Sequence, residues 1–266
     1  MYAKNTVIIT ADYQEHYISD AINSCLMQKR IKNIRVVAVF SYLKNESILK
    51  KKFKKYKNVF FLKKKKLKKF STQDQLHKIS HALKVVRAGN IYLLDGDDIF
   101  NKNKIFLMQK ELAKSESLIL NNYKIFNELK TINTKPYKKY KKNILYKKFI
   151  NNWPDKISTS SISISHKLLN EFYQNSNPYL WKYLAIDAQL AIFFQVQNKI
   201  KYVEKNLTLK RVHFCNLDQT FSNILTKIYW KRRMEQHSLY KNLTPNQRYI
   251  SLDYFFTKII YLMIGI

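Results

Sequence analysis

Short apolar runs alternate with amphipathic segments through the first half of the chain. Four runs have the length of buried strands, at 7–9, 34–40, 59–62 and 91–94. Apolar residues recur at helical spacing in two segments between these runs, at 17–26 and 76–86. Strand, helix and strand in succession form the unit from which parallel sheets are built. We therefore expect an α/β fold with a mixed, mostly parallel, Rossmann-like sheet flanked by helices.

The second half of the chain has longer helical patterns and a polar interruption. Residues 131–148 are polar, rich in lysine and interrupted by Pro136, which predicts a mobile connection. The remaining segments predict, in order, a helix at 104–115, a strand from 118, an alternating strand at 158–165, a helix from 166 and a helix at 183–196. We expect a polar loop beyond Val203 that carries Arg211 and His213. The apolar tail at 254–266 is interpreted as core packing, or alternatively as a peripheral attachment to a membrane that carries a lipid-linked acceptor.

Composition indicates a packed globular protein. The chain has 266 residues, of which 46% are hydrophobic and 14% aromatic, enough for one large α/β domain. The two cysteines, Cys25 and Cys215, lie far apart and outside any metal-binding spacing, which is typical of a reducing compartment. We find no signal peptide and no run long enough to cross a membrane. The expected location is cytoplasmic, with peripheral contact at the inner face of the cell membrane as a further option.

The formal net charge of +31 raises the question of a nucleic-acid partner. The basic residues are mostly lysine, accompanied by abundant Asn, Ile, Tyr and Phe, as an AT-rich coding sequence would give. Arginine is scarce, and no zinc, helix-turn-helix or RNA-binding signature occurs. We therefore expect no dedicated nucleic-acid partner. The lysines of 50–69 are interpreted as a solvated face, or alternatively as a surface that attracts phosphates or anionic lipid.

The most informative stretch is Asp95-Gly96-Asp97-Asp98, which directly follows the apolar run at 91–94. Three carboxylates within four positions repel one another unless a cation holds them together. Carboxylates at the end of a buried strand suit a hard divalent metal such as Mg²⁺ or Mn²⁺. The alternative is a solvated acidic turn, which the spacing alone does not exclude.

Several segments together resemble family 2 glycosyltransferases over about residues 5 to 235. Residues 7–28 resemble the opening strand and helix of that family and match its pattern at Tyr17, Ile18, Ala21, Ile22, Ser24, Leu26 and Gln28. The stretch Leu94 to Asp98 is similar to the family's metal-binding "DxD" strand. Ser158 to Ser161 resembles the acceptor-side segment, and Asp187 falls where the family places its catalytic base.

The resemblance implies a GT-A-like fold and a role for each matching position. It implies metal ligands at Asp95, Asp97, Asp98 and His213. It implies donor and nucleotide contacts at Thr10, Asp12, Tyr13, Asp95, Gly96 and Arg211. Asp12 and Tyr13 would contact the base, although Asp12 could instead cap the following helix. Asp187 would be the general base of a single, inverting displacement.

Three departures from the family pattern limit what can be carried over. Thr10-Ala11-Asp12-Tyr13 replaces the usual Pro-x-Tyr-Asn, and Phe40-Ser41-Tyr42-Leu43 replaces the usual Asp-Asp-Gly-Ser. Those acids contact the base and ribose in the family, so the nucleotide is not fixed by the resemblance. Ile186 replaces the Glu that usually precedes the base.

The resemblance thus predicts a metal-dependent, hexosyl-type glycosyltransferase of bacterial surface-glycan assembly. A UDP-sugar is the first donor to consider, and the acceptor is a saccharide or a lipid-linked saccharide. We expect a catalytic domain at 1–215, with a nucleotide-sugar half at 1–100 and an acceptor half at 101–215, and a helical C-terminal extension at 216–266. The alternatives are a non-catalytic basic protein that binds nucleic acid or a membrane surface, and a sugar nucleotidyltransferase. The Gly- and Arg-rich phosphate loop of nucleotidyltransferases is absent.

Overall fold

The computed structural model describes residues 4–12, 17–66, 70–127, 131–133, 157–213, 223–246 and 251–265. Within these residues the chain forms a nine-stranded mixed sheet in the order β3-β2-β1-β4-β8-β6-β9-β5, with β7 paired to β6. The strands are β1 (Asn5–Ala11), β2 (Ile34–Phe40), β3 (Val59–Lys63), β4 (Asn90–Asp95), β5 (Ile99–Phe100), β6 (Leu118–Phe126), β7 (Thr131–Asn133), β8 (Ile162–Ser165) and β9 (Ile200–Arg211).

The sheet has a parallel half and a mixed half. Strands β3, β2, β1 and β4 run parallel, as the strand–helix–strand pattern predicts. Strand β8 then pairs antiparallel with both β4 and β6, and β9 runs parallel to β6. Since the carboxyl ends of β1 and β4 lie at the same edge, the residues that follow these two strands are brought together.

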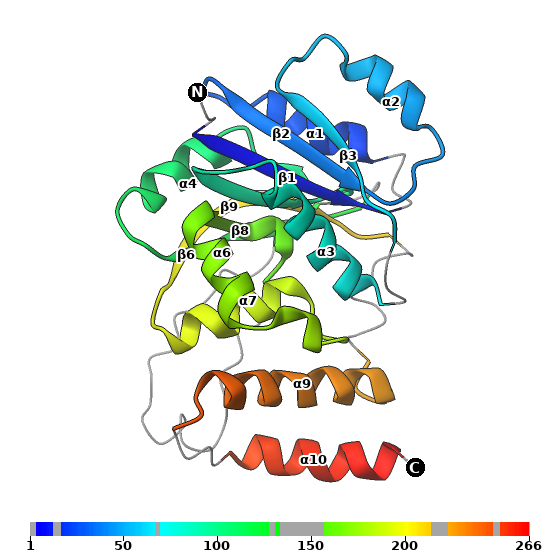
Figure 1. Cartoon of the computed structure of the whole chain (residues 1–266), viewed down its shortest axis with the longest axis vertical. Coiled ribbons are helices and arrows are strands. Elements are labelled where there is room, and N and C mark those ends of the chain that lie inside the picture. Colours follow the sequence, from blue (N-terminus) through cyan, green and yellow to red (C-terminus); the bar gives the residue numbers. More distant parts are fainter. Residues whose placement is uncertain are drawn as a thin grey trace.

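Helices cover both faces of the sheet, and two more lie beyond them (Figure 1). The α-helices are α1 (Ile18–Leu26), α2 (Glu46–Phe53), α3 (Ser71–Leu83), α4 (Lys104–Leu112), α6 (His166–Asn175), α7 (Ile186–Val196), α9 (Lys227–Leu243) and α10 (Leu252–Gly265). Two single 3₁₀ turns complete the described elements, η1 (Thr159–Ser161) and η2 (Pro178–Leu180). In Figure 1, α9 and α10 lie side by side below α7, away from the sheet.

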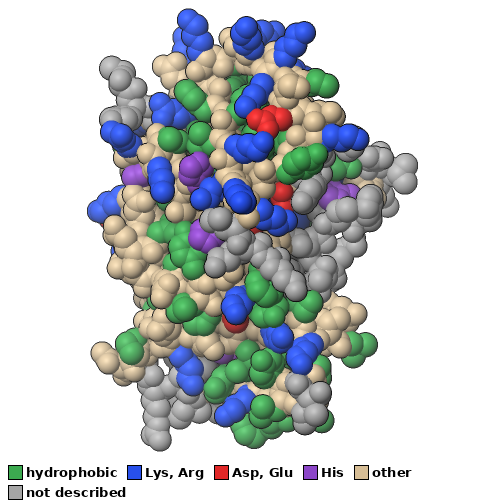
Figure 2. Space-filling view, turned by 45° about the vertical axis from the view of Figure 1, so that its right-hand side comes forward, with side chains coloured by type: hydrophobic (Ala, Val, Ile, Leu, Met, Phe, Trp, Pro, Cys, Tyr) green, Lys and Arg blue, Asp and Glu red, His purple; other side chains and the backbone are tan. Residues whose placement is uncertain are grey.

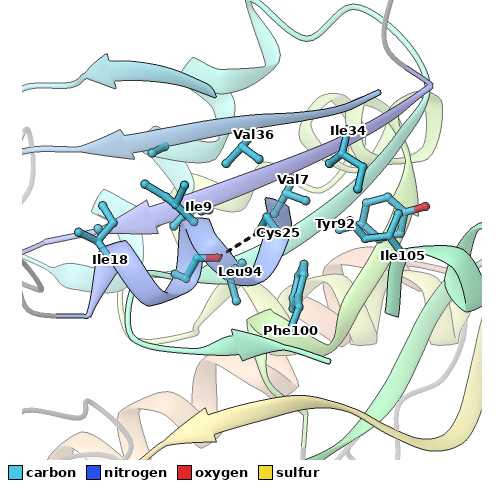
Figure 3. Close-up of a cluster of buried hydrophobic side chains, with 14 of the residues drawn as sticks. Val7, Ile9, Ile18, Cys25, Ile34, Val36, Tyr92, Leu94, Phe100 and Ile105 are labelled. Carbon is cyan, nitrogen blue, oxygen red and sulfur yellow. Dashed lines mark hydrogen bonds between the residues drawn. The ribbon is translucent and has the colours of Figure 1, made fainter. Parts of the chain in front are cut away.

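The alternation of side chains along β1 divides the interior into two cores. Val7 and Ile9 pack with α1, α2 and α4, whereas Ile8 packs on the other face with α3, α6 and α7. Figure 3 shows the first core, in which Cys25 of α1 lies among the strand residues and donates from Sγ to the carbonyl of Ala21 at 3.2 Å. Both faces of the central strands are therefore buried, which explains why their sequences are almost continuously apolar.

A third, smaller core joins α9 to the sheet domain. Leu184, Ala188 and Ile192 pack against Leu239 of α9. Helix α9 thus contacts the same helix, α7, that carries Asp187. Among the described residues, no helix is both long and apolar enough to cross a membrane.

Two predicted elements differ from the structure. The alternating segment Ser158–Ser165 is a strand only from Ile162, because Ser158 and Ser161 bond to each other and form η1 instead. The prediction of a polar loop beyond Val203 is wrong, because the residues up to Arg211 belong to the twelve-residue strand β9. Its backbone groups are satisfied by β6, a long-range pairing that local polarity does not reveal.

Candidate active site at the carboxyl ends of β1 and β4

The ends of β1 and β4 are joined by side-chain and backbone hydrogen bonds. Thr10 lies directly opposite Asp95 in the sheet, and the N–H of Gly96 donates to the carbonyl of Thr10 at 2.9 Å. Gln75 of α3 donates from Nε2 to Oδ1 of Asp95 at 2.7 Å and to Oγ1 of Thr10 at 3.2 Å. The structure therefore brings together Thr10, Asp95 and Gly96, and it adds Gln75, which sequence reasoning missed.

The acidic turn that follows β4 is held by the end of β9. The N–H of Arg211 donates to Oδ1 of Asp98 at 2.8 Å, and its Nε donates to the carbonyl of Asp97 at 3.0 Å. His213 Nε2 lies 2.8 Å from Oδ2 of Asp97. Asp97, Asp98, Arg211 and His213 are therefore neighbours, although more than a hundred residues separate the two pairs in sequence.

Arg211 is fixed in place by more than the acidic turn. Its guanidinium carbon lies 4.2 Å from the centre of the Tyr17 ring and 4.6 Å from that of Phe126. Its NH2 group donates to Oδ2 of Asp20 at 3.3 Å, and the residue is buried. These contacts hold the Arg211 side chain against the turn, and the donor contact that the resemblance implies for Arg211 stays a prediction.

The electrostatics of the turn reflect crowded and buried carboxylates. Burial raises the pKa of Asp95 well above its usual range, and the charges of Asp98 and Asp97 raise it further. Burial, followed by the charge of Asp97, also raises the pKa of Asp98 to about 7. Hydrogen bonds from Ser160 and from the N–H of Arg211 oppose the rise at Asp98. The turn therefore concentrates negative charge where water does not solvate it well.

Lys104 lies fully buried behind the turn and was not predicted from the sequence. Its Nζ donates to the carbonyl of Ser160 and to Oγ1 of Thr208, and lies 3.9 Å from the centre of the Phe100 ring. Burial lowers the pKa of Lys104 well below its usual range, whereas the charge of Asp98 raises it. Ser160 in turn accepts the N–H of Asp95 at 2.9 Å. Lys104 thus connects η1, β9 and the end of β4.

Asp12 lies at the same edge of the sheet but makes different contacts. Its carboxylate oxygens lie 2.8 Å from Nζ of Lys66 and 3.9 Å from Nζ of Lys78. Lys78 also pairs with Asp74 at 2.7 Å, and both of these side chains are buried. The alternative that Asp12 caps the following helix is wrong, because α1 begins after Tyr17. Lys66 of the lysine-rich segment thus contacts a predicted site residue through an exposed ion pair.

Asp187 lies in the first turn of α7, where its Oδ1 accepts the N–H of Ala188 at 2.7 Å. Its negative charge contributes to the raised pKa of Asp95, so the two carboxylates lie within electrostatic range of each other. The role of Asp187 as the base stays a prediction. Tyr13, predicted to contact the nucleotide base, lies outside the described residues.

The predicted metal ligands contact other groups of the protein. Among the residues that the structure describes, no group of three or more His, Cys, Asp or Glu side chains is arranged as a metal site. Asp97 contacts His213, and Oδ1 of Asp98 accepts the N–H of Arg211. The other carboxylate oxygen of Asp98, Oδ2, is buried without a hydrogen-bond partner. Oxygen ligands of this kind fit Mg²⁺ or Mn²⁺ chemically, although the acids are not assembled around a common point.

Comparison with known proteins supports the fold. No family model matches the chain, and no curated protein matches it in sequence. The chain is similar in structure to residues 1–349 of S. aureus TarS, a GT-A-type glycosyltransferase, in two complexes. The complex with UDP has a TM-score of 0.62 and the complex with UDP-GlcNAc a TM-score of 0.64, each at 14% identity. The matches cover 98% of this chain and 70% and 71% of those chains, respectively. A longer TarS structure matches with a TM-score of 0.62 at 16% identity and is covered over 43% of its length. The fold is GT-A-like.

Proposed function

We propose that the protein is a glycosyltransferase that takes a sugar from a nucleotide diphosphate donor bound at the carboxyl ends of β1 and β4. The observation that carries the proposal is the meeting of Asp95, Asp97 and Asp98 with Arg211 and His213 at one edge of a GT-A-like sheet. Ligands of open α/β sheets bind beyond the carboxyl ends of the strands. UDP-sugars are the first donors to test, because the similar TarS structures contain UDP and UDP-GlcNAc.

A divalent cation, Mn²⁺ or Mg²⁺, would be held by Asp95, Asp97 and Asp98, with His213 as a further ligand. Such a cation would neutralise the negative charge that develops on the departing diphosphate. The chain's own residues prepare this position: Gln75 orients Asp95, and Arg211 and Lys104 fix the turn and the segments beside it. Thr10, Gly96 and Asp12 would line the nucleotide side, with Tyr13 and Arg211 as the remaining predicted donor contacts.

The acceptor hydroxyl must lose its proton as the new bond forms, and Asp187 is the proposed base. Asp187 stands in the first turn of α7, at the position where the family 2 glycosyltransferases that the sequence resembles place their base, and this position supports the proposal. One base and no nucleophilic carboxylate would give direct displacement with inversion. The acceptor would be a saccharide or a lipid-linked saccharide of a surface glycan, and residues 1–215 would carry the catalytic machinery in a hexosyl-type enzyme of family 2 type.

The experiment is a panel of UDP-, GDP- and TDP-sugars incubated with the protein and Mn²⁺, with release of the nucleoside diphosphate as the signal. Release that requires both the protein and the cation would support the proposal. An Asp97→Asn variant separates the reaction from a contaminating activity, because it should release no more than a blank without protein. If no sugar nucleotide is bound or cleaved, the non-catalytic alternative is favoured.

A further inference from the structure

The helix α10 carries its polar and apolar residues in the reverse of the arrangement expected for a surface helix. Its outward-facing large apolar residues are between 38% and 71% exposed, and they are Leu252, Phe255, Phe256, Ile259, Leu262 and Met263. The spacing of these residues places them on one side of the helix, and we call them the α10 stripe. Figure 2 shows hydrophobic side chains gathered at the end of the molecule where α9 and α10 lie.

The opposite side of α10 faces the protein and carries Asp253, Tyr254 and Thr257. Asp253, the single acid of this helix, lies 2.6 Å from the guanidinium of Arg233 and 3.4 Å from Nε2 of His237, both on α9. The ring of Tyr254 lies 5.3 Å from that of His237, and Thr257 is buried. Water would favour the opposite orientation, so the outward face of α10 is adapted to an apolar environment.

The surroundings of the α10 stripe are basic. Helices α9 and α10 together contain six Lys and Arg residues and two acids. Both acids are engaged within the protein, since Asp253 pairs with Arg233 and Glu235 accepts the N–H groups of 182–184. The exposed charge beside the stripe is therefore positive, and it includes Lys258, which is exposed at the flank of the stripe.

We propose that α10 binds the surface of an anionic lipid bilayer, with the α10 stripe inserted among the acyl chains and the neighbouring lysines at the headgroups. A 14-residue helix is about 21 Å long, too short to cross a hydrocarbon core of about 30 Å, so α10 lies in the plane of the interface. A second copy of the chain fits this face less well, because two molecules that each carry a net charge of +31 repel each other. An anionic surface fits both the apolar stripe and the charge.

Co-sedimentation with vesicles tests the proposal. The protein should bind vesicles of phosphatidylcholine mixed with phosphatidylglycerol, and much less to phosphatidylcholine alone, because each basic residue near an anionic surface strengthens binding about fivefold. The variant Phe255→Gln/Phe256→Gln/Leu262→Gln should bind at least about tenfold more weakly, since it removes most of the inserted apolar area. The variant Met27→Gln/Ile48→Gln/Val85→Gln, which changes three exposed apolar residues far from α10, should bind like the wild type.

Circular dichroism of each variant establishes that it is folded. The single variant Met263→Gln changes only the most exposed residue of the stripe and disturbs the fold less than the triple variant does. Equal vesicle binding by the wild type and all α10 variants would overturn the proposal, because the lysines alone would then account for binding. So would the absence of vesicle binding by the wild type. A dimer in analytical ultracentrifugation that the triple α10 variant dissociates would assign the stripe to a second copy instead.

Discussion

The N–H of Arg211 donates to Oδ1 of Asp98 at 2.8 Å, and this bond ties the end of β9 to the acidic turn after β4. The side chain of Arg211 adds a bond to the carbonyl of Asp97 and contacts Asp20, Tyr17 and Phe126. Three segments that are far apart in sequence are therefore fixed around one guanidinium group. The shape of the acidic turn depends on a residue outside the turn.

We expect Arg211→Lys to weaken both the turn and the fold. Lysine keeps the charge but cannot make the same set of directed bonds or stack its planar group on two rings. The loss should be about 1–3 kcal/mol in the free energy of unfolding, measured by urea denaturation. Lys210→Arg, a neighbouring change that conserves charge, provides the matched control. Unchanged stability of Arg211→Lys would mean that the contacts of the guanidinium group contribute little.

Lys104 should matter for the site more than for the fold. Methionine has a side chain of similar length without the charge, so Lys104→Met should stay folded, at a cost of about 1–3 kcal/mol for the buried acceptors left without a donor. The carbonyl of Ser160 and the hydroxyl of Thr208 would lose their common donor, and the turn would lose part of its support. Nucleotide affinity should fall about tenfold, as expected for one lost charged hydrogen bond. Isothermal titration calorimetry with UDP measures this change, and wild-type affinity in a folded variant would exclude a positioning role.

Glu235 of α9 connects the C-terminal helices to the segment before α7. Its two carboxylate oxygens accept the N–H groups of Lys182, Tyr183 and Leu184 at 2.7 to 3.0 Å. Glu235→Ala should leave these donors without their acceptor and lower the free energy of unfolding by about 2 kcal/mol. Because 182–184 lead directly into the helix that carries Asp187, turnover should fall as well.

The exposed acid Glu204 on β9 allows a matched comparison, and Glu204→Ala should change neither stability nor turnover. Hydrogen exchange of the 182–184 amides measures directly whether their hydrogen bonds to Glu235 are present. Faster exchange at these amides in Glu235→Ala, with the rest of the sheet unchanged, would show local release of the segment. Equal exchange in the two variants would contradict the assigned role of Glu235.

The order of strands and helices in the first hundred residues is predictable because both faces of the central strands are buried. Strand β2 begins and ends at the residues that its apolar run predicts, Ile34 and Phe40. The acidic turn is likewise visible from three carboxylates at the end of an apolar run. Strand β9 was missed because its pairing with β6 is a long-range contact, and the polar residues along it resemble those of a loop. Gln75 and Lys104 were missed for a related reason, since neither side chain has a sequence pattern that indicates its distant partners.

Asp187→Asn should separate catalysis from donor binding. Loss of a general base lowers kcat by about a hundred- to ten-thousand-fold, whereas the proposed diphosphate contacts lie on other residues. The change keeps the size of the side chain and an oxygen able to accept the N–H of Ala188. Steady-state kinetics with a saturating acceptor measures the change, together with the Kd for UDP. A near-normal kcat would show that Asp187 acts structurally and that the base is a different residue.

The acidic turn at the end of β4 is proposed to bind a nucleoside diphosphate together with a divalent cation. Titration calorimetry of UDP with and without Mn²⁺ tests this binding on the wild type, on Asp97→Asn and on the control Asp253→Asn in α10. We expect Mn²⁺ to strengthen UDP binding at least about tenfold in the wild type and in Asp253→Asn, and not in Asp97→Asn. Equal UDP affinity with and without Mn²⁺ in all three proteins would contradict it.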